Sequence, residues 1–317
     1  MRRLAVFLLA CILLLTLSAC FSEEVSNPNP QTPPAQNTPN EMPSNTGTAD
    51  TQQNNEHNKP SSPSMEEIPF EEIIAVDNDD CLIKIVAIEE DMIWGYSLKV
   101  YLENKTPDKM LMFSVLSASV NGIDSDPFFA QEVAPGKKSN ESISFSDEAL
   151  EDRIENYTDI LLNFRVYDSN DWSADDVATA SVHVYPYGEE NATKYVRETL
   201  PTDTVLVDNE YVTVIVTDYD PDSFWGYSAN LYIVNKTDTT ITVSTDEVSL
   251  NGFMLDPFYA TSVMPDSCKF SSISWFTSDL EDNGITEVEE IEFILKIYDA
   301  EDWTANDFAY ENISLAP

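Results

Sequence analysis

The chain contains one long stretch of sequence twice, and this duplication limits what it can fold into. The segment WGYSLKVYLENKT at 94–106 returns as WGYSANLYIVNKT at 225–237, 131 residues later. SVNGIDSDPFFA, beginning at Ser119, returns as SLNGFMLDPFYA, beginning at Ser249, at an offset of 130. Units this long are self-sufficient domains rather than solenoid repeats. We therefore expect one fold, present in two copies.

Each copy alternates apolar and polar residues with a period of two. Leu98, Val100 and Leu102 share one phase, and charged or aromatic residues take the other. The same alternation runs through 211–217 and 290–298. Period-two patterning over five to eight residues is typical of strands with one buried face. Both copies are therefore predicted to be rich in strands.

Turn signals separate the alternating segments. Asn-Gly pairs at 121–122 and 251–252 predict tight hairpins, because both residues tolerate positive φ angles. A short helix is expected where Ser278–Glu281 forms a capping box and Asn283-Gly284 stops it, with Ser146–Arg153 as its weaker copy. Many short strands with little helix indicate antiparallel sandwiches. The prediction is an all-β protein: two tandem Ig-like antiparallel β-sandwich domains after a disordered linker.

The linker is recognised by its composition. Residues 21–65 are rich in Pro, Asn, Ser and Thr and have few apolar side chains, so they cannot bury enough surface to offset ordering entropy. We predict a disordered tether here. The expected boundaries are then 66–187 for the first repeat, 188–202 for a polar connector and 203–317 for the second repeat.

The first twenty residues indicate where in the cell the protein is located. Arg2 and Arg3 precede the apolar run 4–15, which is too short to span a bilayer comfortably. The run closes with Leu-Ser-Ala-Cys at 17–20, which resembles the lipobox of bacterial lipoproteins. The resemblance implies that Cys20 is diacylated and becomes the N-terminus, which would anchor the protein to the outer side of the cell membrane. The alternatives are an ordinary secretory signal or an uncleaved anchor.

The repeats resemble Ig-like extracellular domains of Gram-positive lipoproteins, including the immunoprotective extracellular type. This resemblance implies the sandwich fold and surface display, and it carries no site residues over. The cysteine pair of antibody domains is missing. Cys81 and Cys268 fall at non-matching positions of the two copies, so we expect two free thiols rather than a disulfide framework.

The net charge of the chain limits which classes of partner it can bind. Asp and Glu number 57 against 16 Lys and Arg, a net charge of −41. Such a chain repels phosphate backbones, so nucleic acid is excluded as a partner. The only histidines are His57 and His183, and neither adjoins a nucleophile or a zinc-ligand pattern. With no Gly-rich phosphate loop either, we expect no enzyme.

Repeated acidic segments are candidate cation sites. Asp218, Asp220 and Asp222 resemble the start of a calcium loop, but Ser223 and Ala229 stand where an EF-hand needs Gly and Glu. A second set is present in both copies: Asp168, Asp171 and Asp176, matched by Asp299, Asp302 and Asp307. The alternative is that these acids form solvated turns, and no cofactor other than Ca²⁺ is suggested.

Repeated aromatic residues are candidate binding residues, because exposed Trp and Tyr stack on sugars or anchor a protein partner. They are Trp94, Tyr96, Phe128 and Trp172, matched by Trp225, Tyr227, Phe258 and Trp303. The alternative is that most of them fill the cores of the sandwiches. Trp172 and Trp303, which lie among acidic residues, are expected to be the most exposed.

Together these features predict a membrane-anchored, surface-exposed lipoprotein that acts as a non-catalytic binding or adhesion module. Its partners would be the lipid bilayer, through Cys20, and an unidentified envelope protein, host protein or glycan. A cation-dependent accessory or sensor module of an envelope complex is the alternative. A carboxylate-dependent hydrolase is the third hypothesis.

Overall fold

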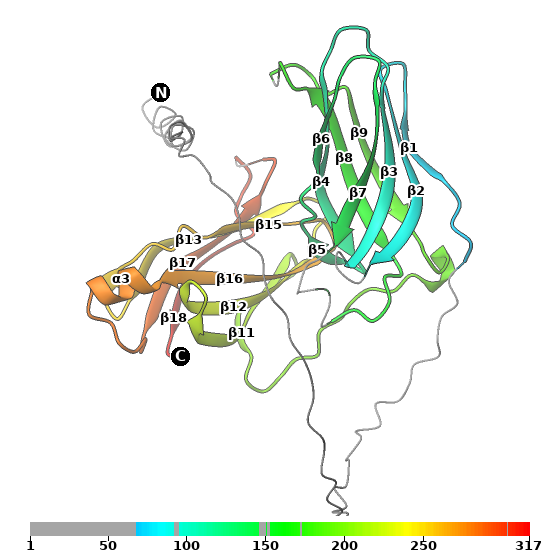
Figure 1. Ribbon diagram of the computed structural model, residues 1–317. Coiled ribbons are helices and arrows are strands. Elements are labelled where there is room, and N and C mark those ends of the chain that lie inside the picture. Colours follow the sequence, from blue (N-terminus) through cyan, green and yellow to red (C-terminus); the bar gives the residue numbers. More distant parts are fainter. Residues whose placement is uncertain (1–67, 92–94, 146–149, 151–152, 172, 303) are drawn as a thin grey trace, which may run out of the picture. The chain divides into compact units, whose positions relative to one another are not determined.

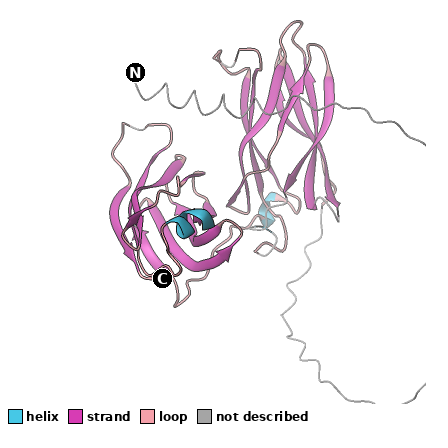
Figure 2. Ribbon diagram, turned by 60° about the vertical axis from the view of Figure 1, so that its left-hand side comes forward, coloured by secondary structure: helices cyan, strands magenta, loops and turns pink. Residues whose placement is uncertain are grey.

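The chain was analysed as a computed structural model, which describes residues 68–91, 95–145, 150, 153–171, 173–302 and 304–317. These residues form strands and loops with very little helix (Figures 1 and 2). The predicted all-β antiparallel sandwich class is confirmed. No helix in this part of the chain is both long and apolar enough to cross a membrane. The lipobox-like segment and the predicted tether at 21–65 lie outside the described residues.

The first repeat forms two sheets. Its strands are β1 (Ile73–Asp77), β2 (Cys81–Asp91), β3 (Gly95–Asn104), β4 (Leu111–Val120), β5 (Ile123–Ser125), β6 (Ala130–Val133), β7 (Lys138–Phe145), β8 (Ile160–Asp168) and β9 (Ala178–Val184). One sheet has the order β1-β2-β3-β7, and in the other β4 pairs with β5, β6 and β8, with β9 beyond β8. All these pairs are antiparallel.

The second repeat uses the same order of strands. They are β10 (Thr204–Asp208), β11 (Val212–Ser223), β12 (Gly226–Asn235), β13 (Ile241–Leu250), β14 (Phe253–Met254), β15 (Ala260–Val263), β16 (Cys268–Phe276), β17 (Ile291–Asp299) and β18 (Ala309–Leu315). One sheet runs β10-β11-β12-β16, and in the other β13 pairs with β14, β15 and β17, with β18 beyond β17. Residues 61–317 form one compact unit. The division into two Ig-like domains at the stated boundaries stays a prediction.

The alternating segments fold as their periodicity predicts. Leu98, Val100 and Leu102 are fully buried on β3, as are Ile291, Leu295 and Ile297 on β17.

The Asn-Gly turns are confirmed as well. Asn121 and Gly122 have φ angles of 50° and 78°, and Asn251 and Gly252 have 49° and 79°. Each pair closes a two-residue hairpin, between β4 and β5 in one repeat and between β13 and β14 in the other.

The predicted helix exists, but its capping was predicted wrongly. Helix α3 spans Thr277–Asp282, and the residue at its N-cap is Phe276, which makes no side-chain cap hydrogen bond. Strand β16 continues to Phe276 and the helix begins at once, so Ser278 lies inside the helix and cannot cap it. Gly284, at φ +68°, follows the helix end as expected. Most of the copy at 146–153 lies outside the described residues.

Each repeat has its own apolar cluster, but the clusters are not independent. The first cluster also contains Ile215, Tyr232 and Cys268 of the second repeat. Strands β5 and β16 meet through a short parallel bridge at Ile123 and Cys268, where the amide of Cys268 donates to Gly122 O at 2.8 Å. Cys81 and Cys268 are both buried and free, as predicted.

The connector packs against the second repeat, although its sequence suggested a polar joint. The ring of Tyr195 meets that of Phe270 at 5.9 Å, edge to face. The guanidinium of Arg197 donates to both carboxylate oxygens of Asp203 at 2.7 Å. Those two side chains are largely shielded from solvent, at 12% and 1% exposure.

The chain enters and leaves the first repeat at neighbouring points. The amide of Ile68, ahead of β1, donates to the carbonyl of Pro186, just after β9, at 3.2 Å. The two ends of the repeat therefore lie side by side.

Candidate functional site

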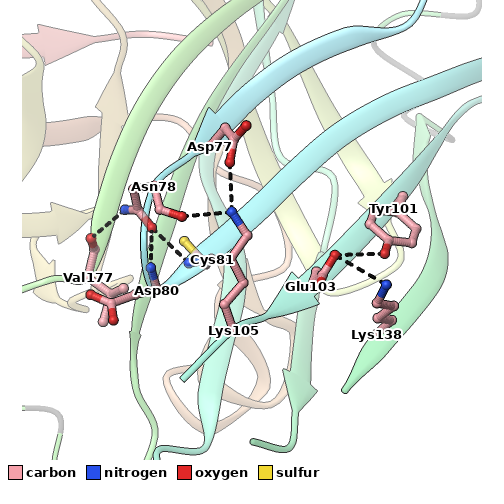
Figure 3. A network of polar contacts seen from close by, with 9 residues as sticks. All are labelled: Asp77, Asn78, Asp80, Cys81, Tyr101, Glu103, Lys105, Lys138 and Val177. Atoms are coloured by element: carbon pink, nitrogen blue, oxygen red, sulfur yellow. Dashed lines mark hydrogen bonds and ion pairs between the residues drawn. The ribbon is translucent and has the colours of Figure 1, made fainter. Parts of the chain in front are cut away.

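The most strongly repeated motifs turn out to hold strands together. Lys105 of the Asn-Lys-Thr turn places its Nζ 2.7 Å from Asp77 Oδ1 and 2.7 Å from the carbonyl of Asn78 (Figure 3). Asn78 Oδ1 in turn accepts from the amides of Asp80 and Cys81. This network fastens β1, β2 and the end of β3.

The second repeat builds the same network. Lys236 Nζ lies 2.8 Å from Asp208 Oδ1 and 2.7 Å from the carbonyl of Asn209. The Asn residues that open the two turns, Asn104 and Asn235, are buried and satisfied by backbone and threonine partners. These repeated motifs are therefore explained by folding alone.

A smaller pair of contacts adds to the first sheet. Tyr101 Oη donates to Glu103 Oε2 at 2.8 Å, and Lys138 Nζ approaches the same carboxylate at 3.5 Å (Figure 3). Both contacts lie across the exposed side of β3 and β7, where a solvated ion pair contributes little to stability.

The acidic segments after β8 and β17 form turns whose carboxylates accept local hydrogen bonds. Asp299 Oδ1 accepts from the amides of Glu301 and Asp302, at 2.8 and 3.1 Å. Asp302 Oδ1 accepts from the hydroxyl and the amide of Thr304. These hydrogen bonds lower the pKa of both carboxyls.

The remaining members of this set also have protein partners. Asp168 accepts from the amide of Asn170 and Asp171 from the hydroxyl of Ser173. Asp176 pairs with Arg165 at 2.8 Å, and Asp307 lies 4.0 Å from Lys296.

Asp218, Asp220 and Asp222, whose spacing resembles the start of a calcium loop, do not lie in a loop. All three lie on strand β11, because the hairpin with β12 continues to Ser223. Asp218 accepts from Asn230 Nδ2 at 2.7 Å, and Asp220 from the amide of Asp222. In the described part of the chain, no three His, Cys, Asp or Glu side chains gather as a metal site would need.

The candidate aromatic residues occupy different environments. Tyr227 belongs to the second core, 6.1 Å from Trp275 between ring centres, and Tyr96 is half-buried against Tyr157. Trp225 is 58% exposed, so it does not take the alternative core position. Trp94, Trp172 and Trp303 lie outside the described residues.

Trp225 forms one side of a groove on the second repeat. The cavity holds about 400 Å³, and its aromatic lining includes Trp225, Phe258 and Phe276. These side chains are 58%, 90% and 53% exposed, which is unusual for rings of this size. The rings of Trp225 and Phe276 meet edge to face at 5.9 Å. We call this feature the aromatic groove.

A glycine makes this arrangement sterically feasible. Gly226 pairs with Phe276 across β12 and β16 at a φ of +139°. A Cβ at this position would lie 2.3 Å from the carbonyl oxygen of Trp275. The strands can therefore approach closely only because position 226 is glycine, and this approach sets Trp225 beside Phe276.

Phe258 is held outward by its own turn. Its amide donates to Asp256 Oδ1 at 2.8 Å, and its φ is +52°, in the left-handed region that bulky residues avoid. Strain at an exposed aromatic residue is a reason to suspect function.

The floor of the groove is hydroxyl-rich. Tyr259 Oη donates to Ser271 Oγ at 3.0 Å, and Ser272 Oγ donates to Asn230 Oδ1 at 2.7 Å. Burial raises the pKa of Tyr259 to about 12, so its phenol is neutral at physiological pH. None of the described residues that line the groove carries a charged side chain.

Phe258 is one of the repeated aromatic residues that the sequence suggests for binding, whereas Phe276 was not predicted from the sequence. The sequence does contain a signal for Phe276. On β16, Ile273 and Trp275 occupy the buried phase, which places Phe276 on the outward phase. An outward aromatic residue at a strand end is what the pattern could have revealed.

Comparisons with known proteins add no family. A search among protein families finds no match, and neither does a search among characterised proteins. One similar solved structure is the exo-chitosanase CsxA of Amycolatopsis orientalis, 11% identical over 73% of this chain and 26% of that chain, with a TM-score of 0.22. Another is the CsuC-CsuE chaperone–tip adhesion subunit complex from Csu pili of Acinetobacter baumannii, 13% identical over 69% of this chain and 90% of that chain, with a TM-score of 0.21. At such scores neither carries an argument about function.

Proposed function

We propose that this protein is a lipid-anchored, surface-displayed lipoprotein that acts without catalysis as a binding or adhesion module. The observation that carries the binding role is the aromatic groove, in which Trp225, Phe258 and Phe276 expose most of their surface to solvent. Large apolar side chains that converge on one cavity are characteristic of recognition surfaces.

Anchoring is supported by the sequence. The apolar run at 4–15 and the Leu-Ser-Ala-Cys segment ending at Cys20 fit acylation of that cysteine. A diacylglycerol thioether supplies the two chains that stable anchoring requires. The polar residues at 21–65 would then hold the sandwiches away from the bilayer.

Cys20→Ser tests the anchor, and Cys11→Ser in the apolar run is the matched control. Cells expressing each form are fed labelled fatty acid, and the protein is partitioned between detergent and water. We expect the parent and Cys11→Ser to carry label and enter the detergent phase, and Cys20→Ser to do neither. If Cys20→Ser is labelled and partitions like the parent, the lipoprotein proposal is wrong.

A further inference from the structure

The aromatic groove has a second property besides its rings: it is uncharged. The chain carries 57 acidic residues, yet the lining consists of aromatic, proline, alanine, serine and threonine residues. An anionic ligand would meet the field of the surrounding acids, and a cationic ligand would find no counter-charge inside the groove. The lining fits an uncharged ligand.

The exposed rings favour a ligand with flat C–H faces. The face of an aromatic ring is electron-rich, and the C–H groups on one side of a pyranose ring carry partial positive charge, so the two attract when stacked. Trp225 and Phe276 stand nearly perpendicular, at 82°. Successive units of a bent or twisted chain could therefore each meet a ring.

The polar part of the lining supplies matching hydrogen bonds. Ser271 Oγ accepts from Tyr259 Oη, which leaves the Ser271 hydroxyl hydrogen able to donate to a ligand. Ser272 and Ser274 also line the groove. Hydroxyls beside aromatic rings suit a ligand that is itself a mixture of hydroxyls and C–H faces.

The size of the groove suits a small unit of a ligand. Its volume of about 400 Å³ lies in the range of pockets that bind small molecules, so it can hold a few sugar rings of a longer chain.

The described residues of the first repeat do not provide the same lining. Through the strand register, Glu141 stands where the second repeat has Ser271. In the sequence, Ser146 is the residue that matches Phe276. Phe129 replaces Tyr259 and removes the hydroxyl. Phe128, the counterpart of Phe258, is still 99% exposed. Among its described residues, the first repeat therefore keeps the exposed ring of Phe128 without the uncharged, hydroxyl-rich lining.

We infer that the aromatic groove of the second repeat binds an uncharged polysaccharide, stacking its sugar rings on Trp225 and Phe276. This inference rests on the proposed binding function and names its ligand class.

Affinity electrophoresis provides the test. Residues 21–317, which keep the whole compact unit of residues 61–317, are run in native gels containing mixed-linkage β-glucan, galactomannan or dextran. Polygalacturonate and chitosan serve as the anionic and cationic comparators. We expect retardation by at least one of the uncharged polymers, and little change in it between low and high NaCl, because no charge is involved.

The variants locate the site. Trp225→Ala and Phe276→Ser should each weaken retardation about tenfold, since a stacked ring at a hot spot is worth more than about 1.4 kcal/mol. Phe276→Ser also installs a residue favoured at a helix N-cap, so the fold is not endangered. Phe128→Ala removes the equivalent exposed ring of the first repeat and should bind like the parent. Thermal unfolding of all three should resemble that of the parent, which confirms that they are folded.

Three results would overturn the inference. They are equal retardation of the parent, Trp225→Ala and Phe276→Ser; retardation by chitosan alone that falls with salt; and no retardation by any of the five polymers. In each case the Cys20 labelling experiment measures acylation and membrane anchoring independently of ligand binding. A chain that is acylated and still holds cells to a protein-coated surface would keep the binding function while refuting its polysaccharide ligand.

Discussion

Replacing Gly226 with alanine tests the close approach of strands on which the aromatic groove depends. The new Cβ would lie 2.3 Å from Trp275 O and 2.6 Å from the amide nitrogen of Thr277. Both are backbone atoms, so no side chain can rotate away to relieve the overlap. The strands β12 and β16 must separate at this end, which also breaks the hydrogen bond from Thr277 N to Trp225 O.

Two other glycines in the chain provide a graded scale for the effect. Gly252 has a φ of +79° and nothing within 4 Å of a built Cβ, so alanine there brings only the left-handed penalty of about 1–2 kcal/mol, partly offset by a less flexible unfolded chain. Gly95, the first-repeat counterpart of Gly226, has a φ of +67° and a Cβ contact of 3.2 Å with Phe145 O. Gly226 combines an unfavourable φ with a true overlap, and we expect about 4 kcal/mol.

The assay is equilibrium unfolding in urea together with a thermal melt. For a domain of this size each kcal/mol lowers the Tm by about 2–4 °C, so Gly226→Ala should melt about 10 °C below the parent and Gly252→Ala only about 3 °C below it. Gly95→Ala should fall between them. If Gly226→Ala is no less stable than Gly252→Ala, the strand ends separate freely, and the glycine is not what holds Trp225 beside Phe276.

Two further predictions concern charge. Arg197 lowers the pKa of Asp203, so this pair contributes stability above about pH 4 that is lost as the pH falls through the depressed pKa. In urea unfolding from pH 3 to 7, the difference in unfolding free energy between the parent and Arg197→Met should be largest at neutral pH, and a difference that stays constant with pH would contradict this. Because like charges crowd the surface, the Tm should rise with NaCl, while millimolar CaCl₂ should add no more than MgCl₂ does. A calcium-selective rise that disappears when Asp299, Asp302 and Asp307 become Asn would instead establish a metal site.

Strands and tight turns could be predicted from the sequence because their causes are local. The alternation at Leu98, Val100 and Leu102 needs only one buried face. The Asn-Gly turns need only two residues that accept positive φ.

The aromatic groove could not be predicted because it depends on contacts between strands distant in sequence. Trp225 precedes β12 and Phe276 ends β16, and only the pairing of Gly226 with Phe276 brings them together. The strand position of Asp218, Asp220 and Asp222 could not be predicted for a related reason. Their alternation fits a calcium loop and an extended hairpin equally well, and only the partner strand β12 decides between them.

The connector was misjudged from its composition. It reads as polar, but Tyr195 finds an aromatic partner in Phe270 and Arg197 finds one acid, Asp203. A single aromatic residue can hold a polar segment in place if it packs against an apolar surface elsewhere in the protein. The sequence of the segment alone does not reveal that surface.

The hydrogen bond between Ile68 and Pro186 has a consequence for mechanics. A domain whose two ends lie side by side forms a side loop on the main path of the chain. If the protein is tethered at its N-terminus, a pull on a ligand in the second repeat can pass from the tether to the connector through this junction, while the β5–β16 bridge offers a second path through the first sandwich. Because its two ends meet, the first sandwich then adds little to the distance between the end of the tether and the start of the connector.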